Sequence, residues 1–161
     1  MFDERYGRHP LGYANPPFTD GITGKSHSAF DMKDRVEHLA RALSKELGFK
    51  PDEGTEWDKV VGCFSLNTID YMTLVWAVHR LGGIVSACNA AYNSEELEYQ
   101  VKSSGCKAIF TALPLLKTCT KGVESSNISK EKIFILPLAE QYEKGFENTG
   151  HKTIDDLIKE G

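Results

Sequence analysis

Val60-Val-Gly-Cys-Phe64 is followed along the chain by Ile84-Val-Ser-Ala-Cys88, Lys107-Ala-Ile-Phe-Thr111 and Lys132-Ile-Phe-Ile-Leu136. These four short runs begin roughly two dozen residues apart, and segments with helical patterning lie between them. Alternation of strands and helices at this spacing is typical of βαβ units. Because the runs are apolar on both faces, they are also typical of buried parallel strands. The sequence therefore predicts an α/β fold built on a mainly parallel sheet.

The segments between the runs carry helix start and stop signals. A first helix is expected over residues 68–81, with Asn67 and Asp70 as its candidate cap and Gly82-Gly83 as its end. Ser94 is expected to cap a second helix, and Gly105 is expected to end it. Further helices are predicted over residues 113–123 and 154–159. Each run is thus joined to the next by a helical connection.

The part of the chain before these runs has a different pattern. Residues 1–17 are expected to form an irregular arm, because glycines and prolines interrupt any regular pattern there. Residues 18–28 resemble a hairpin, since Asp20-Gly21 and Gly24 bracket a short loop. A helix follows, with one apolar stripe, Ser28 as its candidate cap and Gly48 as its end. The stripe consists of Met32, Val36, Leu39, Ala40, Leu43 and Leu47.

Composition excludes several classes of protein. The chain has 161 residues, of which 40% are hydrophobic, and a net charge of −4. Nucleic acid is therefore not an expected partner, because no basic stripe could neutralise a row of phosphates. No segment is apolar for long enough to span a membrane, and the N-terminus lacks the apolar core of a signal peptide. The four cysteines contain no Cys-x-x-Cys pair, which predicts reduced core thiols in an intracellular protein: Cys63, Cys88, Cys106 and Cys119.

Two motifs invite a nucleotide-binding interpretation. Gly24-Lys25-Ser26 resembles the end of a Walker A loop, but Thr19 stands where the motif needs its first glycine, so a hairpin turn is the favoured interpretation. Bulky residues occupy the turn after the first run, at Phe64-Ser-Leu-Asn-Thr68, where a dinucleotide-binding fingerprint would need glycines. The sequence therefore disfavours both a phosphate loop and a Rossmann cofactor site.

No catalytic or metal-binding constellation is visible in the pattern. Ser65 follows a predicted strand, as the serine of a nucleophile elbow does, but it lacks the glycines that such a turn requires. The histidines show no spacing typical of metal ligands: His9, His27, His38, His79 and His151. The residues alone thus predict a soluble α/β domain without an evident active site.

Two segments taken together resemble a known family. Residues 58–111 include Leu81-Gly-Gly-Ile-Val and Asn89-Ala-Ala-Tyr-Asn-Ser-Glu-Glu-Leu, and residues 18–47 include Asp20-Gly-Ile-Thr-Gly-Lys-Ser26 before a helix. In this order the two segments resemble the N-terminal region of AMP-forming acyl-CoA synthetases. The resemblance is closest to the 4-coumarate–CoA ligase-like group of this adenylate-forming superfamily, including its fungal members. Leu66 and Ala90 stand where the family usually has proline.

The resemblance implies a ligase that acts in two steps. A carboxylate attacks the α-phosphate of Mg-ATP to form an acyl-adenylate, and coenzyme A then displaces AMP. ATP, Mg²⁺ and coenzyme A are thus implied for the parent enzyme, with a small carboxylic acid of fatty acid or phenylpropanoid type as substrate. In the family, a Ser/Thr/Gly-rich phosphate loop and a lysine on a C-terminal domain carry the chemistry.

None of the family's catalytic, cofactor-binding or metal-binding motifs matches positions of this sequence, so no such residue is assigned here. Residues 18–161 are expected to be the α/β N-terminal portion of an AMP-binding domain, truncated before the phosphate loop. The 161-residue chain is therefore expected to be inactive by itself. The positions that do match the family are expected to be structural: Gly82, Gly83, Asn89 and Tyr92.

Other interpretations stay open at this point. The chain could be a stand-alone, non-catalytic α/β binding or interaction module, or an unrelated nucleotide- or flavin-binding α/β protein. A truncated sheet would leave apolar surface uncovered, which predicts self-association. The expected compartment is the cytoplasm or the peroxisome, because a peroxisomal address would lie at a C-terminus beyond Gly161.

Overall fold

A four-stranded parallel sheet lies at the centre of the structure, a computed structural model that describes residues 15–161. Its strands are β3 (Val60–Phe64), β4 (Ile84–Ala87), β5 (Ala108–Thr111) and β6 (Ile133–Ile135), in the spatial order β4-β3-β5-β6. The predicted α/β fold is confirmed. Most of the expected arm, residues 1–14, lies outside the described residues, and residues 15–17 belong to no helix or strand.

Among the strands of the sheet, β3 comes first along the chain and is one of the two inner strands. Val61 of β3 pairs with Val85 on one side and with Ala108 on the other, and both ladders are parallel. Every residue of β3, β5 and β6 is buried, whereas β4 forms an edge and is partly exposed. The continuous apolar character of the runs thus follows from burial on both faces of the sheet.

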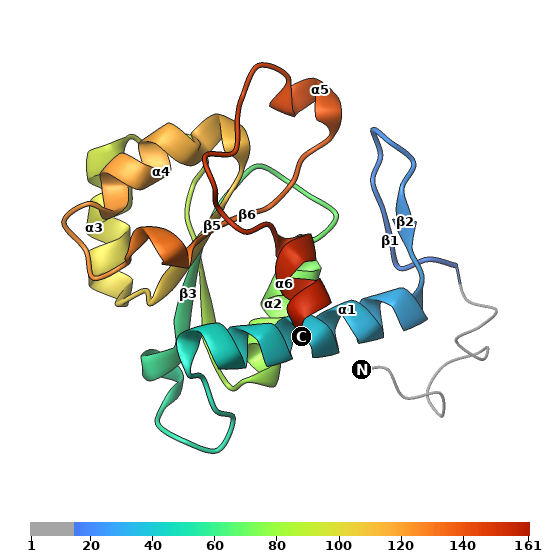
Figure 1. The fold of residues 1–161 in the computed structure, drawn as a ribbon, viewed down its shortest axis with the longest axis horizontal. Helices are drawn as coiled ribbons and strands as arrows, with labels where there is room; N and C mark the ends of the chain where they lie inside the picture. Colours follow the sequence, from blue (N-terminus) through green and yellow to red (C-terminus); the bar gives the residue numbers. More distant parts are fainter. Residues whose placement is uncertain (1–14) are drawn as a thin grey trace.

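Helices cover both faces of the sheet and create two hydrophobic cores (Figure 1). The helices α1 (Ala29–Leu47), α2 (Tyr71–Arg80) and α6 (Ile154–Glu160) pack on one face. The helices α3 (Ser94–Ser104) and α4 (Leu116–Val123) pack on the other. Successive residues of a strand point to opposite faces, so Val61 joins the first core and Val60 the second. A short helix, α5 (Glu140–Glu143), lies outside both cores and was not predicted.

The first helix has the expected stripe and the expected ends. The buried residues of α1 include Met32, Val36, Leu39 and Leu43. Ser28 and Asp31 form a capping box, and Gly48 ends the helix at φ 70°, a left-handed conformation that glycine adopts without steric cost. None of the helices in residues 15–161 has the length and apolarity needed to cross a membrane.

The predicted N-terminal caps of two helices are wrong. α2 begins at Tyr71 rather than at residue 68, and Asp70 makes no side-chain cap bond, because its carboxylate is turned toward α1 instead. α3 is capped by Asn93, one residue before the expected Ser94. The Asn93 side chain accepts bonds from the amides of Glu95 and Glu96. In both cases the sequence offers two polar residues that could cap the helix. The tertiary structure determines which of them occupies the N-cap position.

The predicted hairpin at the start of the described chain is confirmed. Strand β1 (Phe18–Thr19) pairs antiparallel with β2 (Ser26–His27). Gly24, at φ 72°, and Lys25 lie in the turn between the two strands. The Gly24-Lys25-Ser26 motif therefore belongs to a hairpin turn, as the sequence favoured.

Gly82 and Gly83 connect α2 to β4 where the chain passes close to the start of β3. Gly82 has φ 68°, and a Cβ atom added to Gly83 would lie 2.4 Å from the carbonyl oxygen of Lys59. Such a distance is shorter than any normal contact, so backbone would have to move. The predicted structural role of both glycines is therefore consistent with their geometry.

Replacing Gly83 with alanine should lower the free energy of unfolding by about 2 kcal/mol, because overpacking against backbone strains the junction. Gly21→Ala is the matched control, since an added Cβ there meets no atom within 4 Å. It should change stability by less than about 0.5 kcal/mol. Urea denaturation followed by circular dichroism measures both. Equal stability of the two variants would contradict the close approach at Gly83.

Candidate functional site

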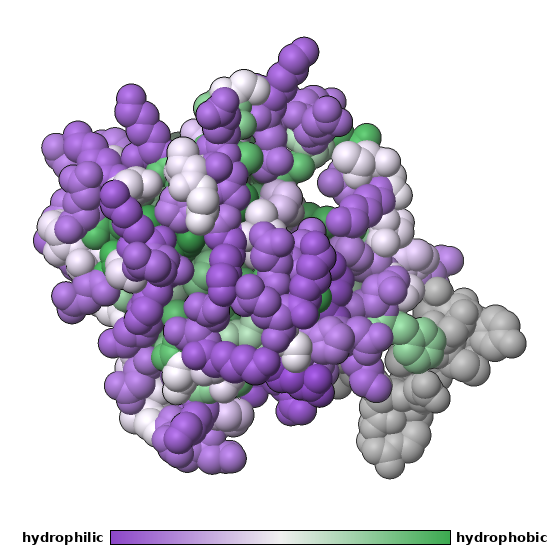
Figure 2. Space-filling model, in the orientation of Figure 1, coloured by the Kyte–Doolittle hydropathy of each residue, from purple (hydrophilic) through white to green (hydrophobic). Residues whose placement is uncertain are grey.

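A pocket of about 660 Å³ opens at the carboxyl edge of the sheet. Its walls are the β1–β2 hairpin, the segment from Leu66 to Met72 and the residues Pro137–Ala139, with Tyr142 at one side. In Figure 2 it is a hollow between the hairpin and the body of the molecule, with hydrophobic residues beside it. Open α/β sheets commonly bind ligands beyond the carboxyl ends of their strands, so this is the candidate site.

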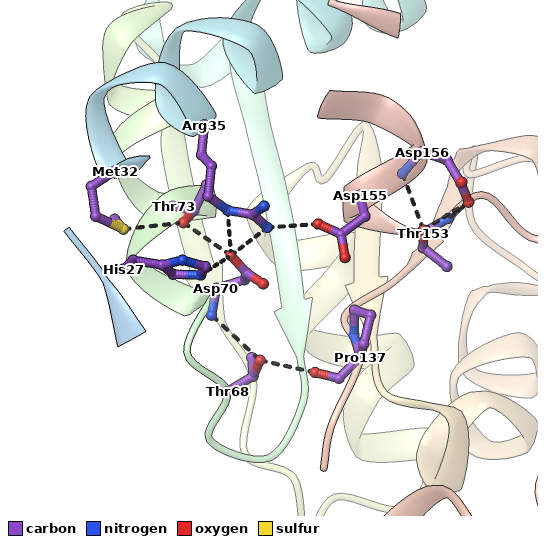
Figure 3. A network of polar contacts seen from close by, with 10 residues as sticks. All are labelled: His27, Met32, Arg35, Thr68, Asp70, Thr73, Pro137, Thr153, Asp155 and Asp156. Atoms are coloured by element: carbon purple, nitrogen blue, oxygen red, sulfur yellow. Dashed lines mark hydrogen bonds and ion pairs between the residues drawn. The ribbon is translucent and has the colours of Figure 1, made fainter. Parts of the chain in front are cut away.

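The sheet itself positions two of the walls. Strand β3 ends at Phe64 and β6 at Ile135, and the chain leaves both at the same edge because the strands are parallel. The Thr68 hydroxyl donates a hydrogen bond of 2.9 Å to the carbonyl of Pro137, which ties the two loops together (Figure 3). Leu66, one of the two positions that depart from the family pattern, is exposed on this wall.

A buried carboxylate lies at the floor of the pocket. Asp70 is only 3% exposed, and its Oδ1 atom accepts hydrogen bonds from Nε and Nη2 of Arg35 at 3.0 and 2.7 Å. The Thr73 hydroxyl donates a third bond to the same oxygen at 3.2 Å. A buried carboxylate needs this compensation, because desolvation of an unpaired charge costs several kcal/mol.

Arg35 connects this carboxylate to a second helix (Figure 3). Its Nη2 atom also donates a bond of 2.8 Å to Asp155, in the first turn of α6. Burial by itself would lower the pKa of Arg35, but the carboxylates of Asp70 and Asp155 outweigh it and raise that pKa. The guanidinium therefore stays charged, and it holds α1, α2 and α6 together.

His27 completes the cluster from the hairpin. It is 5% exposed, and its Nε2 atom lies 3.3 Å from Oδ1 of Asp70 without forming a hydrogen bond. Burial lowers the pKa of His27, although the Asp70 carboxylate opposes this shift. The ring is therefore uncharged at neutral pH. Since Arg35 is paired with both Asp70 and Asp155, the ionic groups of the cluster form a structural junction between the helices.

The other described histidines lie apart from this cluster. His38 is exposed on α1, and His79 is exposed in the last turn of α2. His151 has its Nδ1 atom 3.1 Å from the carbonyl oxygen of Ile133, and His9 lies outside the described residues. Within residues 15–161, no group of three or more His, Cys, Asp or Glu side chains could hold a metal ion.

The side chains that could act as nucleophiles are either hydrogen-bonded to the backbone or buried. The Ser65 hydroxyl donates to the carbonyl of Leu66 at 2.9 Å. All four cysteines are free and buried, which confirms the predicted core thiols. Burial raises the pKa of Cys63, Cys88 and Cys119 to about 12 and raises that of Cys106 as well. At neutral pH these thiols are protonated and therefore unreactive.

The two remaining family-matching positions have local packing roles. The Asn89 side chain accepts a hydrogen bond of 3.0 Å from the amide of Ala91, which shapes the turn before α3. Tyr92 packs against the core between the sheet and the α3–α4 pair. In contrast, the roles of Arg35, Asp70 and Asp155 in joining three helices were not predicted from the sequence. A charged residue close to an apolar stripe, as Arg35 is to Met32 and Val36, was the available signal.

Replacing Asp70 with alanine should lower the free energy of unfolding by about 3 kcal/mol, because Arg35 loses its main partner in a buried setting. Asp155→Ala is the matched control: its side chain is 41% exposed, so its loss should cost less than about 1 kcal/mol. Urea denaturation at neutral pH measures both variants.

The double variant Arg35→Met, Asp70→Ala tests the same pair in another way. It should lose less stability than the two single variants added together, because neither charge is then left unpaired. Strict additivity, or equal losses for the Asp70 and Asp155 variants, would contradict the central role of the Arg35–Asp70 pair.

Comparison with known proteins gives consistent matches. The family model described as AMP-binding enzyme matches residues 10–154. The acyl-CoA ligase frbB of Dothideomycetidae sp. is 44% identical over 147 residues, which cover 91% of this chain and 26% of that protein. The acyl-CoA ligase easD of Emericella nidulans is 41% identical over 147 residues, again 91% of this chain and 26% of that protein. The chain thus spans about a quarter of the length of these relatives.

Solved structures share the fold at lower identity. A benzoate CoA ligase from Burkholderia xenovorans LB400 aligns with a TM-score of 0.66 at 17% identity, over 86% of this chain and 24% of that one. The luciferase-like enzyme of the Zophobas morio mealworm aligns with a TM-score of 0.68 at 21% identity, over 87% of this chain and 29% of that one. Since the family model covers residues 10–154, the chain belongs to the AMP-binding enzyme family.

Proposed function

We propose that this chain is the N-terminal part of an ATP-dependent carboxylate–CoA ligase. The observation that carries the proposal is its identity of 44% and 41% to two fungal proteins named acyl-CoA ligases. The alternative of an unrelated nucleotide- or flavin-binding protein is wrong, because the family model matches nearly the whole chain. The narrower assignment to a 4-coumarate–CoA ligase-like group stays a prediction.

The proposed reaction has two steps. A carboxylate attacks the α-phosphate of ATP, which gives an acyl-adenylate and releases pyrophosphate. The thiol of coenzyme A then attacks the acyl carbon, and AMP leaves. ATP, Mg²⁺, coenzyme A and a small carboxylic acid are accordingly the proposed cofactors and substrates of the parent protein.

The described residues do not fit an ATP site. Adenylation needs a cluster of backbone amides, a metal ion and a lysine around the phosphates. Lys25 is exposed in a hairpin turn, and no metal-binding group of acidic residues occurs in residues 15–161. We therefore place the phosphate loop and the catalytic lysine outside this sequence. We propose that residues 18–161 form the α/β N-terminal portion of the AMP-binding domain, truncated before the phosphate loop.

The compartment, the self-association of the chain and the alternative of a stand-alone module all stay predictions. The compartment is proposed to be the cytoplasm or the peroxisome. Self-association of the chain is proposed because strand β4 lies at an edge of the sheet. A charged residue or a proline in an edge strand would discourage pairing with another strand, and β4 contains neither. A stand-alone binding module stays the second candidate function. The coding sequence beyond Gly161 distinguishes it from the N-terminal part of a carboxylate–CoA ligase.

The coding sequence downstream of Gly161 should contain a Ser/Thr/Gly-rich loop ending in lysine. The full-length product, supplied with Mg-ATP, coenzyme A and a panel of aliphatic and aromatic acids, should form CoA thioesters detectable by mass spectrometry. The 161-residue chain is the matched control and should form none, because it has no phosphate loop. A stop codon after Gly161 would favour the binding module, and thioester formation by the short chain would overturn the placement of the active site.

A further inference from the structure

Strand β4 has a neighbouring strand on one side only. It pairs in parallel with β3, and no other strand of residues 15–161 lies beside it. The opposite edge of the sheet is covered, because the amide of Ile135 in β6 donates to the carbonyl of Lys152 at 2.9 Å. Within the described part of the chain, β4 is therefore the edge at which the sheet can be extended.

The backbone groups that β4 leaves open follow from its pairing. The amide of Cys88, directly after β4, donates to the carbonyl of Cys63 in β3 at 2.8 Å. Because successive residues of a strand direct their N–H and C=O groups to alternate sides, Val85 and Ala87 direct theirs away from β3. The Ala87 carbonyl accepts a bond of 2.9 Å from the Gln100 side chain of α3. Both groups of Val85 and the N–H of Ala87 are left for another strand.

We propose that β4 is a dimerisation edge, at which two copies of this chain pair antiparallel about a two-fold axis through Val85. The proposal deepens the self-association proposed above and rests on it, but it is independent of the ligase activity. In this register each Val85 donates to and accepts from the other. The N–H of Ala87 donates to the Gly83 carbonyl of the second copy. The Gly83 amide is already bound to the Val78 carbonyl at 3.0 Å, so it does not compete with Gln100 for the Ala87 carbonyl.

The surface beside the edge suits an identical partner. A groove lies between β4 and α3, with Ser86 on one side and Tyr99 on the other. Tyr99 is 76% exposed, more than any other large hydrophobic residue of the described chain, and tyrosine is enriched in protein interfaces. The two-fold axis of an antiparallel strand pair is perpendicular to the sheet. Both α3 helices then lie on the same face, and the groove of one copy faces the groove of the other.

The charges of α3 also favour this arrangement. Glu95 and Glu96 lie in the first turn of α3, and Lys102 lies in its last turn. The two α3 helices run antiparallel across the two-fold axis, so the acidic end of one lies toward the basic end of the other. A second copy is therefore the occupant that both the backbone and the side chains fit.

Sedimentation equilibrium of the 161-residue chain tests the proposal. Its average mass should rise with concentration from 17.9 kDa to twice that value and no further, because a two-fold contact closes on itself. Val85→Pro should raise the dissociation constant at least about tenfold, since proline removes the central donor. Proline is compatible with this position, because the missing N–H faces away from β3. Val85→Thr is the matched control and should dimerise normally, since it keeps the amide and the branched shape.

Residue-resolved amide exchange of the unmodified chain gives a second test, which holds even if Val85→Pro fails to fold by circular dichroism. The amides of Val85 and Ala87 should gain protection as the protein concentration rises. The amide of Cys88 is the internal control, because its bond to β3 protects it at every concentration.

The outcomes separate the edge from self-association in general. A chain that stays monomeric would overturn both. A dimer that Val85→Pro leaves intact would overturn the role of β4 and leave self-association standing. Oligomers larger than the dimer, or protection of Val85 that does not depend on concentration, would overturn the two-fold pairing. The ligase proposal is judged separately, by thioester formation of the full-length product.

Discussion

The buried Asp70 carboxylate is the constraint on which the arrangement of the helices depends. It lies at the N-terminus of α2, where the partial positive charge of the helix favours an anion, but its hydrogen bonds go to Arg35 on α1 and to Thr73. Both Arg35 nitrogens reach the same oxygen, which makes the pair geometrically specific. Through Asp155, the same guanidinium also fixes α6. Three helices that share one face of the sheet are thus held in register by one side chain.

This junction also explains why the pocket has its present shape. Because Asp70 is drawn inward, α2 starts at Tyr71, and the preceding residues form a loop instead of another helical turn. Thr68 in that loop binds the carbonyl of Pro137, so the chain after β3 and the chain after β6 meet at one edge. The hairpin covers the remaining side. The pocket is therefore a consequence of helix placement and does not require any residue devoted to a ligand.

The fold could be predicted from the sequence because its determinants are local and repeated. Each strand is a short apolar run, and glycines such as Gly48 and Gly105 mark where helices end. The junction could not be predicted in this way, because Arg35 and Asp155 are 120 residues apart in sequence. Asn67 and Asp70 together were predicted to cap the helix, but Asp70 occupies the N-cap position without a side-chain cap bond and pairs with Arg35 instead. Long-range polar contacts carry no periodicity, and so a single sequence does not reveal them.

The contrast between dispersed and locally clustered determinants also explains why this sequence reveals the family but not the family's catalytic residues. Family membership is visible in this chain because packing constraints, such as the close approach of Gly83 to Lys59, are spread over many positions. Phosphate chemistry instead needs a few groups held together at one point, and the cation at this sheet edge, Arg35, is already paired with Asp70 and Asp155. Arg35 cannot clamp a phosphate while it compensates two carboxylates, and Lys25 points from a solvent-exposed turn. The chain spans about a quarter of the length of the acyl-CoA ligases it matches, and Arg35, Asp70 and Asp155 within it join three helices on one face of the sheet.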